Sequence, residues 1–144
     1  MKSNTVNGWC FPAAMITDSL MTVLRHSIAG IASIQLDDQA LDRLSWRDFG
    51  NGLKMARLAR EGKREMVVYR IAAGAAANVF LRHEHVGGEY YLVLKGAIAD
   101  ETGSYRAGDV VYLDPKSIHR PHAPAGAGET VVLVVWPEGV TVLE

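Results

Sequence analysis

The sequence predicts an all-β fold, a small sandwich or barrel with a helical extension at its N-terminus. From about Leu53 onward, short runs of β-prone residues alternate with Gly, Pro, Asn and Asp, and seven or more strands at this spacing are typical of a sandwich or barrel. Between Phe11 and Gly30 the large apolar residues recur instead at helical intervals. With 144 residues, 49% hydrophobic and 22% charged, the chain has the composition of one globular domain with a single core.

The charge balance and the cysteine count exclude several classes of function. Fifteen Lys and Arg residues face sixteen Asp and Glu residues, a formal charge of −1, so we expect neither nucleic-acid binding nor an acidic tail. One cysteine stands beside five histidines, which is too little sulfur for a disulfide framework, a thiolate zinc finger or an iron–sulfur cluster. Any bound metal must therefore be held by imidazole and carboxylate groups.

The first predicted element is a helix between Phe11 and Gly30, which places His26 in that helix. Its apolar stripe follows steps of three and four residues, and consists of Ile16, Leu20, Val23, Leu24, Ile28 and Ile31. Pro12 suits the first turn of a helix and Gly30 its end. Because Asp18 and Arg25 interrupt the segment, it resembles neither a secretory leader nor a membrane span. We expect a cytoplasmic protein without a membrane anchor.

The segment after Gly30 has two interpretations. Asp37 or Asp38 caps a short helical turn that extends to Leu44, or the stretch is an irregular arm. Residues 1–44 are accordingly assigned to an N-terminal helical arm or extension, and residues 45–144 to the β-barrel. The stripe of the first helix has little surface of its own domain to cover, so we expect a homodimer whose interface includes Phe11–Gly30.

The β-prone runs of the second part follow one another with turn residues between them. They are Leu53–Leu58, Met66–Ala72, Val79–His85, Tyr90–Lys95, Val110–Leu113, Thr130–Trp136 and Val140–Leu143. The run Val131–Trp136 is apolar on both faces, which indicates that one face lines an interior and the other packs on a second sheet or a partner subunit. Gly103–Gly108 is interpreted as a turn between strands.

Histidines and one glutamate gather in the middle of this region. His83 and His85 are two residues apart, so a strand would point both rings to one face. Gly87-Gly88 permits a tight reversal that folds Glu89 back beside them, and would place Tyr91 and Val93 on its face. The turn-forming stretch Asp114–Ser117 then brings His119 from another strand.

Three imidazoles and one carboxylate form a ligand set for a divalent metal with open coordination positions. The set suits Fe(II), Mn(II), Ni(II), Co(II), Cu(II) or Zn(II) without choosing among them, and open positions are what a site for chemistry needs. Each residue alone has a simpler interpretation, as a solvated strand histidine, a surface carboxylate or a loop histidine. His122 is the fallback ligand, although its odd offset from His119 would turn it to the opposite face of a strand.

Two sequence motifs resemble those of the cupin superfamily. The run from His83 to Gly96, H-E-H-V-G-G-E-Y-Y-L-V-L-K-G, resembles the first cupin motif, and the run from Gly108 to His119, G-D-V-V-Y-L-D-P-K-S-I-H, resembles the second. Between Trp46 and Trp136 the chain is similar to the cupin domain of ChrR-type anti-sigma factors and their stand-alone relatives. The resemblance implies a cupin jelly-roll barrel, a small double-stranded β-helix, with a metal held at one end by His83, His85, Glu89 and His119.

The chain departs from the cupin pattern at two positions. Ala77 stands where many cupins carry a glycine, and Lys116 stands in place of the glycine in the turn of the second motif. Since a lysine adopts a glycine-only backbone conformation at a cost, we expect this turn to differ from that of other cupins.

The resemblance implies two classes of function. The first is a metal-dependent enzyme that acts on a small oxygenated molecule, with Fe(II) dioxygenase chemistry ranked first and with Arg70, Tyr91 and Tyr112 as candidate pocket-lining residues. The second is a non-catalytic metal-sensing or small-molecule-sensing module. Sigma-factor binding is disfavoured, because those anti-sigma factors carry a zinc domain that uses a histidine and two cysteines, whereas Cys10 is the only thiol here.

Overall fold

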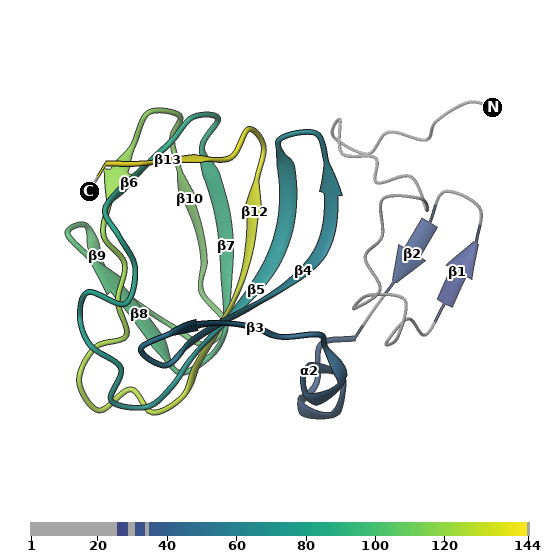
Figure 1. Cartoon of the computed structure of the whole chain (residues 1–144), viewed down its shortest axis with the longest axis horizontal. Coiled ribbons are helices and arrows are strands. Elements are labelled where there is room, and N and C mark those ends of the chain that lie inside the picture. The colour runs from purple at the N-terminus through teal and green to yellow at the C-terminus, as the bar shows by residue number, and fades with distance from the viewer. Residues whose placement is uncertain (1–25, 29–30, 34, 144) are drawn as a thin grey trace.

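The computed structural model describes residues 26–28, 31–33 and 35–143, which are mostly antiparallel strands (Figure 1). Its elements are β1 (His26–Ile28), β2 (Ile31–Ser33), α2 (Asp38–Arg43), β3 (Arg47–Gly50), β4 (Leu53–Glu61), β5 (Arg64–Ile71), β6 (His83–His85), β7 (Glu89–Lys95), β8 (Ala97–Asp100), β9 (Gly103–Arg106), β10 (Val110–Leu113), β11 (Ile118–His119), β12 (Thr130–Trp136) and β13 (Val140–Val142). The predicted all-β class is confirmed.

The barrel consists of one large sheet and two small ones. Six strands pair in the order β10-β7-β12-β5-β4-β3, while β11-β6-β13 and the hairpin β8-β9 form the smaller sheets. Strands β10, β7, β12, β5 and β4 stand side by side as one curved wall, and β6, β13, β8 and β9 lie across from them (Figure 1). The arrangement leaves an interior between the sheets, with β6 and β11 on the side facing β7.

The large sheet is apolar on both of its faces, as the run Val131–Trp136 predicts. Val132, Val134 and Trp136 belong to the interior cluster, which also contains Tyr91 and Val93. Val131 points to the other face and packs with Ala40, Leu41 and Leu44 at α2, together with three residues of the neighbouring strands, Ala56, Leu58 and Val68. The second face at Val131 is thus covered by a helix of the same chain.

Helix α2 resolves the alternative that the sequence leaves open after Gly30. Asp37 is the N-cap, and its side chain accepts a hydrogen bond from the Ala40 amide at 2.8 Å. Asp38 in the first turn and Arg43 in the last complement the helix dipole, and the extended backbone of Leu44 ends the helix. Within the described residues, no helix has the length and hydropathy that crossing a membrane requires.

The helix predicted for Phe11–Gly30 lies largely outside the described residues. At its C-terminal end the prediction is wrong, because His26–Ile28 and Ile31–Ser33 pair as the antiparallel strands β1 and β2. His26 is therefore a strand residue. Spacing alone misled the prediction, since Ile28 and Ile31 also fit a hairpin with a two-residue connection.

The strand predictions need three further corrections. The run Val79–His85 forms a strand only at His83–His85, because residues 77–80 form turns and bends. Gly103–Gly108 is not simply a turn, since Gly103–Arg106 is strand β9 and pairs with β8. Short strands β3, β8 and β11 were also missed, because strands of two to four residues carry too few apolar residues to show a period.

Candidate metal centre

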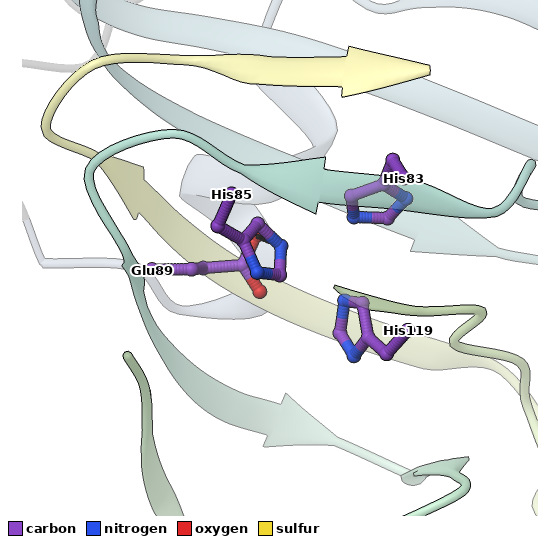
Figure 2. A group of neighbouring side chains, drawn as sticks. All are labelled: His83, His85, Glu89 and His119. Carbon is purple, nitrogen blue, oxygen red and sulfur yellow. Dashed lines mark ion pairs between the residues drawn. The ribbon is translucent and has the colours of Figure 1, made fainter. Parts of the chain in front are cut away.

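Four side chains from three strands meet at one end of the barrel interior. His83 and His85 come from β6, Glu89 is the first residue of β7 and His119 is the last residue of β11. Each offers one ligand atom, and these four atoms all lie within 4.8 Å of one another. Figure 2 shows the three imidazoles and the carboxylate converging on the same space. His85, Glu89 and His119 are buried, with 0%, 5% and 2% of their surface exposed.

Backbone pairing brings the three rings together. His119 lies directly opposite His83 in the antiparallel β11–β6 pair, and His83 and His85 share one face of β6 as the period of a strand requires. The ring centroids are 4.9 Å apart for His83 and His85, 4.9 Å for His83 and His119, and 4.7 Å for His85 and His119. The rings thus form a nearly equilateral triangle.

A glycine turn returns Glu89 to this triangle. Gly88 has a φ of 83°, and a Cβ at this position would lie 2.7 Å from the Leu113 carbonyl oxygen. Only glycine fits both conditions. The reversal between β6 and β7 that the sequence predicts from Gly87-Gly88 is therefore present, and it places Glu89 Oε2 3.2 Å from His85 Nε2.

Hydrogen bonds at Nδ1 fix the orientation of each imidazole. His83 Nδ1 lies 2.8 Å from the Leu81 carbonyl, His85 Nδ1 lies 3.0 Å from Ser117 Oγ and His119 Nδ1 lies 2.7 Å from Asp100 Oδ2. A carbonyl and a carboxylate accept hydrogen bonds only, so Nδ1 of His83 and of His119 is the protonated nitrogen. Their Nε2 atoms then carry the lone pairs, which is the tautomer that a metal ligand needs.

Electrostatics favour the neutral form of the His83 imidazole and the charged form of the Asp100 carboxylate. Burial lowers the pKa of His83, and the neighbouring imidazoles lower it further, against the opposing effect of the Leu81 carbonyl. Burial by itself would raise the pKa of Asp100, but hydrogen bonds from Thr102 and His119 outweigh it and the net pKa is lowered. A neutral imidazole is the form that binds a metal ion.

The donor set fits a divalent ion. Among the described residues, His85 Nε2 and His119 Nε2 are buried and make no hydrogen bond. A buried polar atom without a hydrogen bond is costly. His85 Nε2 faces Glu89 Oε2 at 3.2 Å without forming a hydrogen bond, and a metal ion would satisfy both this nitrogen and that of His119. Three neutral imidazoles and one carboxylate give a net charge of about +1 with such an ion, and suit the borderline transition metals.

Trp136 anchors the carboxylate. Its Nε1 donates a hydrogen bond of 2.5 Å to Glu89 Oε2 across 47 positions of sequence, and its ring is 9% exposed. This bond occupies one carboxylate oxygen and limits the rotation of the group. Trp136 thus supports the ligand set through Glu89, in the way that outer hydrogen bonds orient metal-binding carboxylates.

Replacing Trp136 with Phe is expected to weaken metal binding about tenfold, because the aromatic ring is kept while the N–H that orients Glu89 is lost. The affinity for Co(II) or Zn(II) is measured by competition with a chromophoric chelator. Trp46→Phe is the matched control, since the Trp46 Nε1 bonds the Leu41 carbonyl at 2.9 Å on the helix side of the sheet. Equal losses in both variants would contradict a role of Trp136 at the centre.

A cavity of about 380 Å³ opens onto three of the four residues, His83, Glu89 and His119. His83, Glu89, His119 and Trp136 form part of its lining together with Tyr91. The other lining residues are mostly apolar, and comprise Phe49, Asn51, Leu53, Tyr69, Asn78, Val79, Phe80, Leu81, Ile98, Pro121, Val132, Val134, Val140 and Val142. This volume lies in the range of small-molecule sites.

The structure separates the second-rank candidates of the sequence. Tyr91 lines the cavity, but Arg70 and Tyr112 do not. Arg70 lies on the opposite face of β5, where its guanidinium stacks on Trp46 at 5.1 Å and forms an ion pair with Asp42 at 3.3 Å. Tyr112 is 50% exposed and stacks on Tyr90. In both cases the neighbouring residue points inward, so the assignment is wrong by one position.

His122 is not brought to the four-residue group. Its backbone forms an isolated antiparallel bridge with Ala99, with hydrogen bonds of 2.8 Å and 2.9 Å. Its side chain is not among the ligand atoms that lie within 4.8 Å of one another. The structure therefore brings His119, and not His122, to the other three residues.

Lys116 adopts the strained conformation that its position in the second motif implies, with a φ of 70°. Lys116→Gly is expected to raise the free energy of unfolding by about 0.5–1 kcal/mol, because relief of a left-handed conformation outweighs the added entropy of glycine in the unfolded chain. The exposed Lys116–Glu84 ion pair, at 3.4 Å, adds little.

Urea denaturation of the metal-free protein measures this gain. Lys54→Gly, at an exposed strand position without a positive φ, is the control and is expected to lose about 0.5–1 kcal/mol. Loss of stability in both variants would contradict strain at Lys116.

The chain matches the family model of the ChrR cupin-like domain over residues 38–139. It is 36% identical over 86 residues to the anti-sigma-E factor ChrR of Cereibacter sphaeroides, which is 60% of this chain and 39% of the relative. The chain thus spans about two fifths of that protein.

Solved structures give the same fold. The Rhodobacter sphaeroides complex of SigE with the anti-sigma ChrR matches at 33% identity with a TM-score of 0.58, covering 67% of this chain and 50% of that one. An acetylacetone dioxygenase from Acinetobacter johnsonii matches at 13% identity with a TM-score of 0.63, covering 83% of each chain. An RmlC-like cupin from Ralstonia eutropha matches at 18% identity with a TM-score of 0.61, covering 76% of this chain and 71% of that one. The chain belongs to the ChrR cupin-like domain family and has the RmlC-like cupin fold.

Proposed function

We propose that this chain holds one divalent metal through His83, His85, Glu89 and His119, and that it is an enzyme acting on a small oxygenated organic molecule. The observation that carries the proposal is the group of four ligand atoms within 4.8 Å, two of them buried imidazole nitrogens without a hydrogen bond. The group faces a cavity large enough for a small molecule. A structural metal would need no such cavity.

Each residue has a separate task in this proposal. The bound metal would supply Lewis acidity and open coordination positions for substrate or oxygen. Glu89 contributes the single negative charge of the ligand set, and Trp136 holds it in one orientation. Asp100 and the Leu81 carbonyl keep the ligating imidazoles in the tautomer with a free Nε2. The apolar walls of the cavity exclude water from the reacting molecule.

Dioxygenase chemistry with Fe(II) ranks first among the enzyme activities. Imidazole and carboxylate ligands with open positions suit Fe(II), and the acetylacetone dioxygenase of Acinetobacter johnsonii has a similar fold. At 13% identity this likeness bears on the fold alone, so the activity remains an analogy.

Metal analysis and oxygen uptake test the enzymatic proposal. The protein is purified without chelators, its metal content is measured, and the Fe(II)-loaded form is mixed with small diketones, phenols and thiols in an oxygen electrode. We expect about one metal per chain and uptake with at least one of these classes. Tightly bound zinc, together with no uptake in the Fe(II)-loaded form, would contradict it.

The second candidate is a sensing or regulatory module, favoured by the 36% identity to an anti-sigma factor. In this alternative, metal or ligand occupancy of the same centre alters binding to a protein partner. Purified sigma factors of the same organism are passed over the immobilised full chain, with and without Zn(II). Metal-dependent retention of one of them, without oxygen uptake, would support this function over the enzymatic one. A His119→Ala chain is the control, because its retention should not depend on metal.

A further inference from the structure

The cavity above the metal centre has no basic side chain in its described lining. The described lining contains no Lys or Arg. Its only acidic or imidazole side chains are those of His83, Glu89 and His119. With a divalent ion bound, the charge near +1 would be concentrated at the floor. A ligand can therefore place one oxygen-rich end on the metal, whereas its remaining atoms meet no countercharge.

Arg70 and Arg82 each adjoin a lining residue in the sequence but do not line the cavity. Arg70 is on the opposite face of β5, stacked on Trp46. Arg82 precedes His83 by one residue, is exposed and is not part of the lining. Arg47 stacks over the ring of Phe49, a lining residue, at 4.9 Å, so this interaction places a basic group close to the cavity without making it part of the lining.

The polar groups of the walls are uncharged. Tyr69 and Tyr91 line the cavity, and their phenol hydroxyls are uncharged at neutral pH. In the described part of the chain, neither hydroxyl makes a hydrogen bond to another residue. Asn51 and Asn78 are exposed lining residues that add amide groups. These groups can bond ligand oxygens but cannot neutralise an anion.

We infer that the cavity takes small, uncharged organic molecules with oxygen donors at one end and an apolar body, and discriminates against analogues whose body carries a carboxylate or phosphate. The inference rests on the proposed function, because the oxygen-bearing end is assigned to the metal. Its physical basis is that a carboxylate moved into apolar surroundings without a countercharge loses its hydration and gains no partner.

Matched pairs of probes test this preference without turnover. Co(II)-loaded protein is titrated anaerobically with 4-methylcatechol and with 3,4-dihydroxybenzoate, followed by the Co(II) absorption bands. A second pair is heptane-2,4-dione and 4,6-dioxoheptanoate. Each affinity is divided by the affinity of the probe for free Co(II), which removes differences in chelating strength. We expect the uncharged member of each pair to bind at least about tenfold more tightly.

Charge variants at the mouth locate the source of the discrimination. Val142 lines the cavity and is 54% exposed, so Val142→Lys adds a cation with little cost to folding, and is expected to improve carboxylate binding several-fold. Val110→Lys is the matched control, because Val110 is 72% exposed and outside the lining. Arg47→Gln is expected to leave the ratio within each pair unchanged.

The outcomes separate this inference from the proposed function. Equal or tighter binding of the carboxylated members would overturn the inference, as would a response of none of the four probes. Carboxylate binding that disappears in Arg47→Gln would also overturn it, since Arg47 would then supply the countercharge. The proposed enzymatic function fails on a different observation, the absence of oxygen uptake, and discrimination in the anaerobic titration would stand without it.

Discussion

Replacing His119 with Ala is expected to reduce bound metal from about one ion per chain to almost none after dialysis. His119 supplies one of two buried Nε2 atoms without a hydrogen bond, and its ring orientation is fixed by Asp100 at 2.7 Å. Loss of an outer hydrogen-bond partner alone costs 10–100-fold in metal affinity, so loss of the ligand itself should exceed 100-fold. The affinity is measured with a competing chelator and the stoichiometry by elemental analysis.

Two further variants make this result specific. His119→Gln keeps an amide that can donate to the buried Asp100 carboxylate, so this variant should stay folded. It therefore distinguishes the loss of a metal ligand from unfolding of the Ala variant. His122→Ala removes a histidine three residues away that stands outside the group of four, and is expected to bind metal normally. If His122→Ala loses the metal while His119→Gln retains it, the geometry of the centre is wrong.

The part of the site that the sequence predicted depends on local geometry. The period of a strand sets His83 and His85 on one face, and the structure shows their rings 4.9 Å apart. The Gly87-Gly88 reversal needs only two adjacent glycines to return Glu89. Tyr91 and Val93 follow Glu89 into the interior for the same reason. These placements depend only on the stretch from His83 to Val93. They are therefore predicted correctly even where other parts of the fold are not.

The residues that support these ligands were missed because their contacts are long-range. Asp100 reaches His119 across 19 residues, which requires the β8–β9 hairpin and the Ala99–His122 bridge. Trp136 reaches Glu89 across 47 residues, which requires the register of β12 on β7. Ser117 lies within the second cupin-like motif, so a signal for one of the partners was present, but not its role.

The misplaced pocket residues have a different physical cause. On β5 the choice of Arg70 put a charged residue inside, whereas the inward residue is Tyr69. Arg70 is stabilised outside by Asp42 and Trp46, and both lie in or near α2, a helix whose existence the sequence left open. When a strand is apolar on both sides, the elements that pack against it decide which side points inward. Here the six-residue helix α2 covers the outer side.

Replacing Asp100 with Asn is expected to lower metal affinity 10–100-fold with a change of only about 1 kcal/mol in the stability of the metal-free protein. Asp100 Oδ1 accepts hydrogen bonds from the amides of Thr102 and Gly103 at 2.7 Å and 3.2 Å, while Oδ2 faces His119 Nδ1. If the Asn oxygen keeps the turn bonds, its NH₂ group faces Nδ1. That nitrogen must then be the acceptor, which moves the imidazole proton to Nε2 and blocks the ligand atom.

The opposite orientation of the new amide in Asp100→Asn would keep the His119 tautomer but lose the turn bonds, because its NH₂ group would then face two N–H donors of the turn. Either way the turn or the tautomer is lost, whereas a merely packing role of Asp100 would affect neither. Asp109→Asn is the matched control: its carboxylate accepts from the Arg106 amide at 2.8 Å in the following turn, and is exposed. Chelator competition compares the two variants, with urea denaturation of each metal-free form. Equal metal affinity in both would contradict control of the His119 tautomer by Asp100.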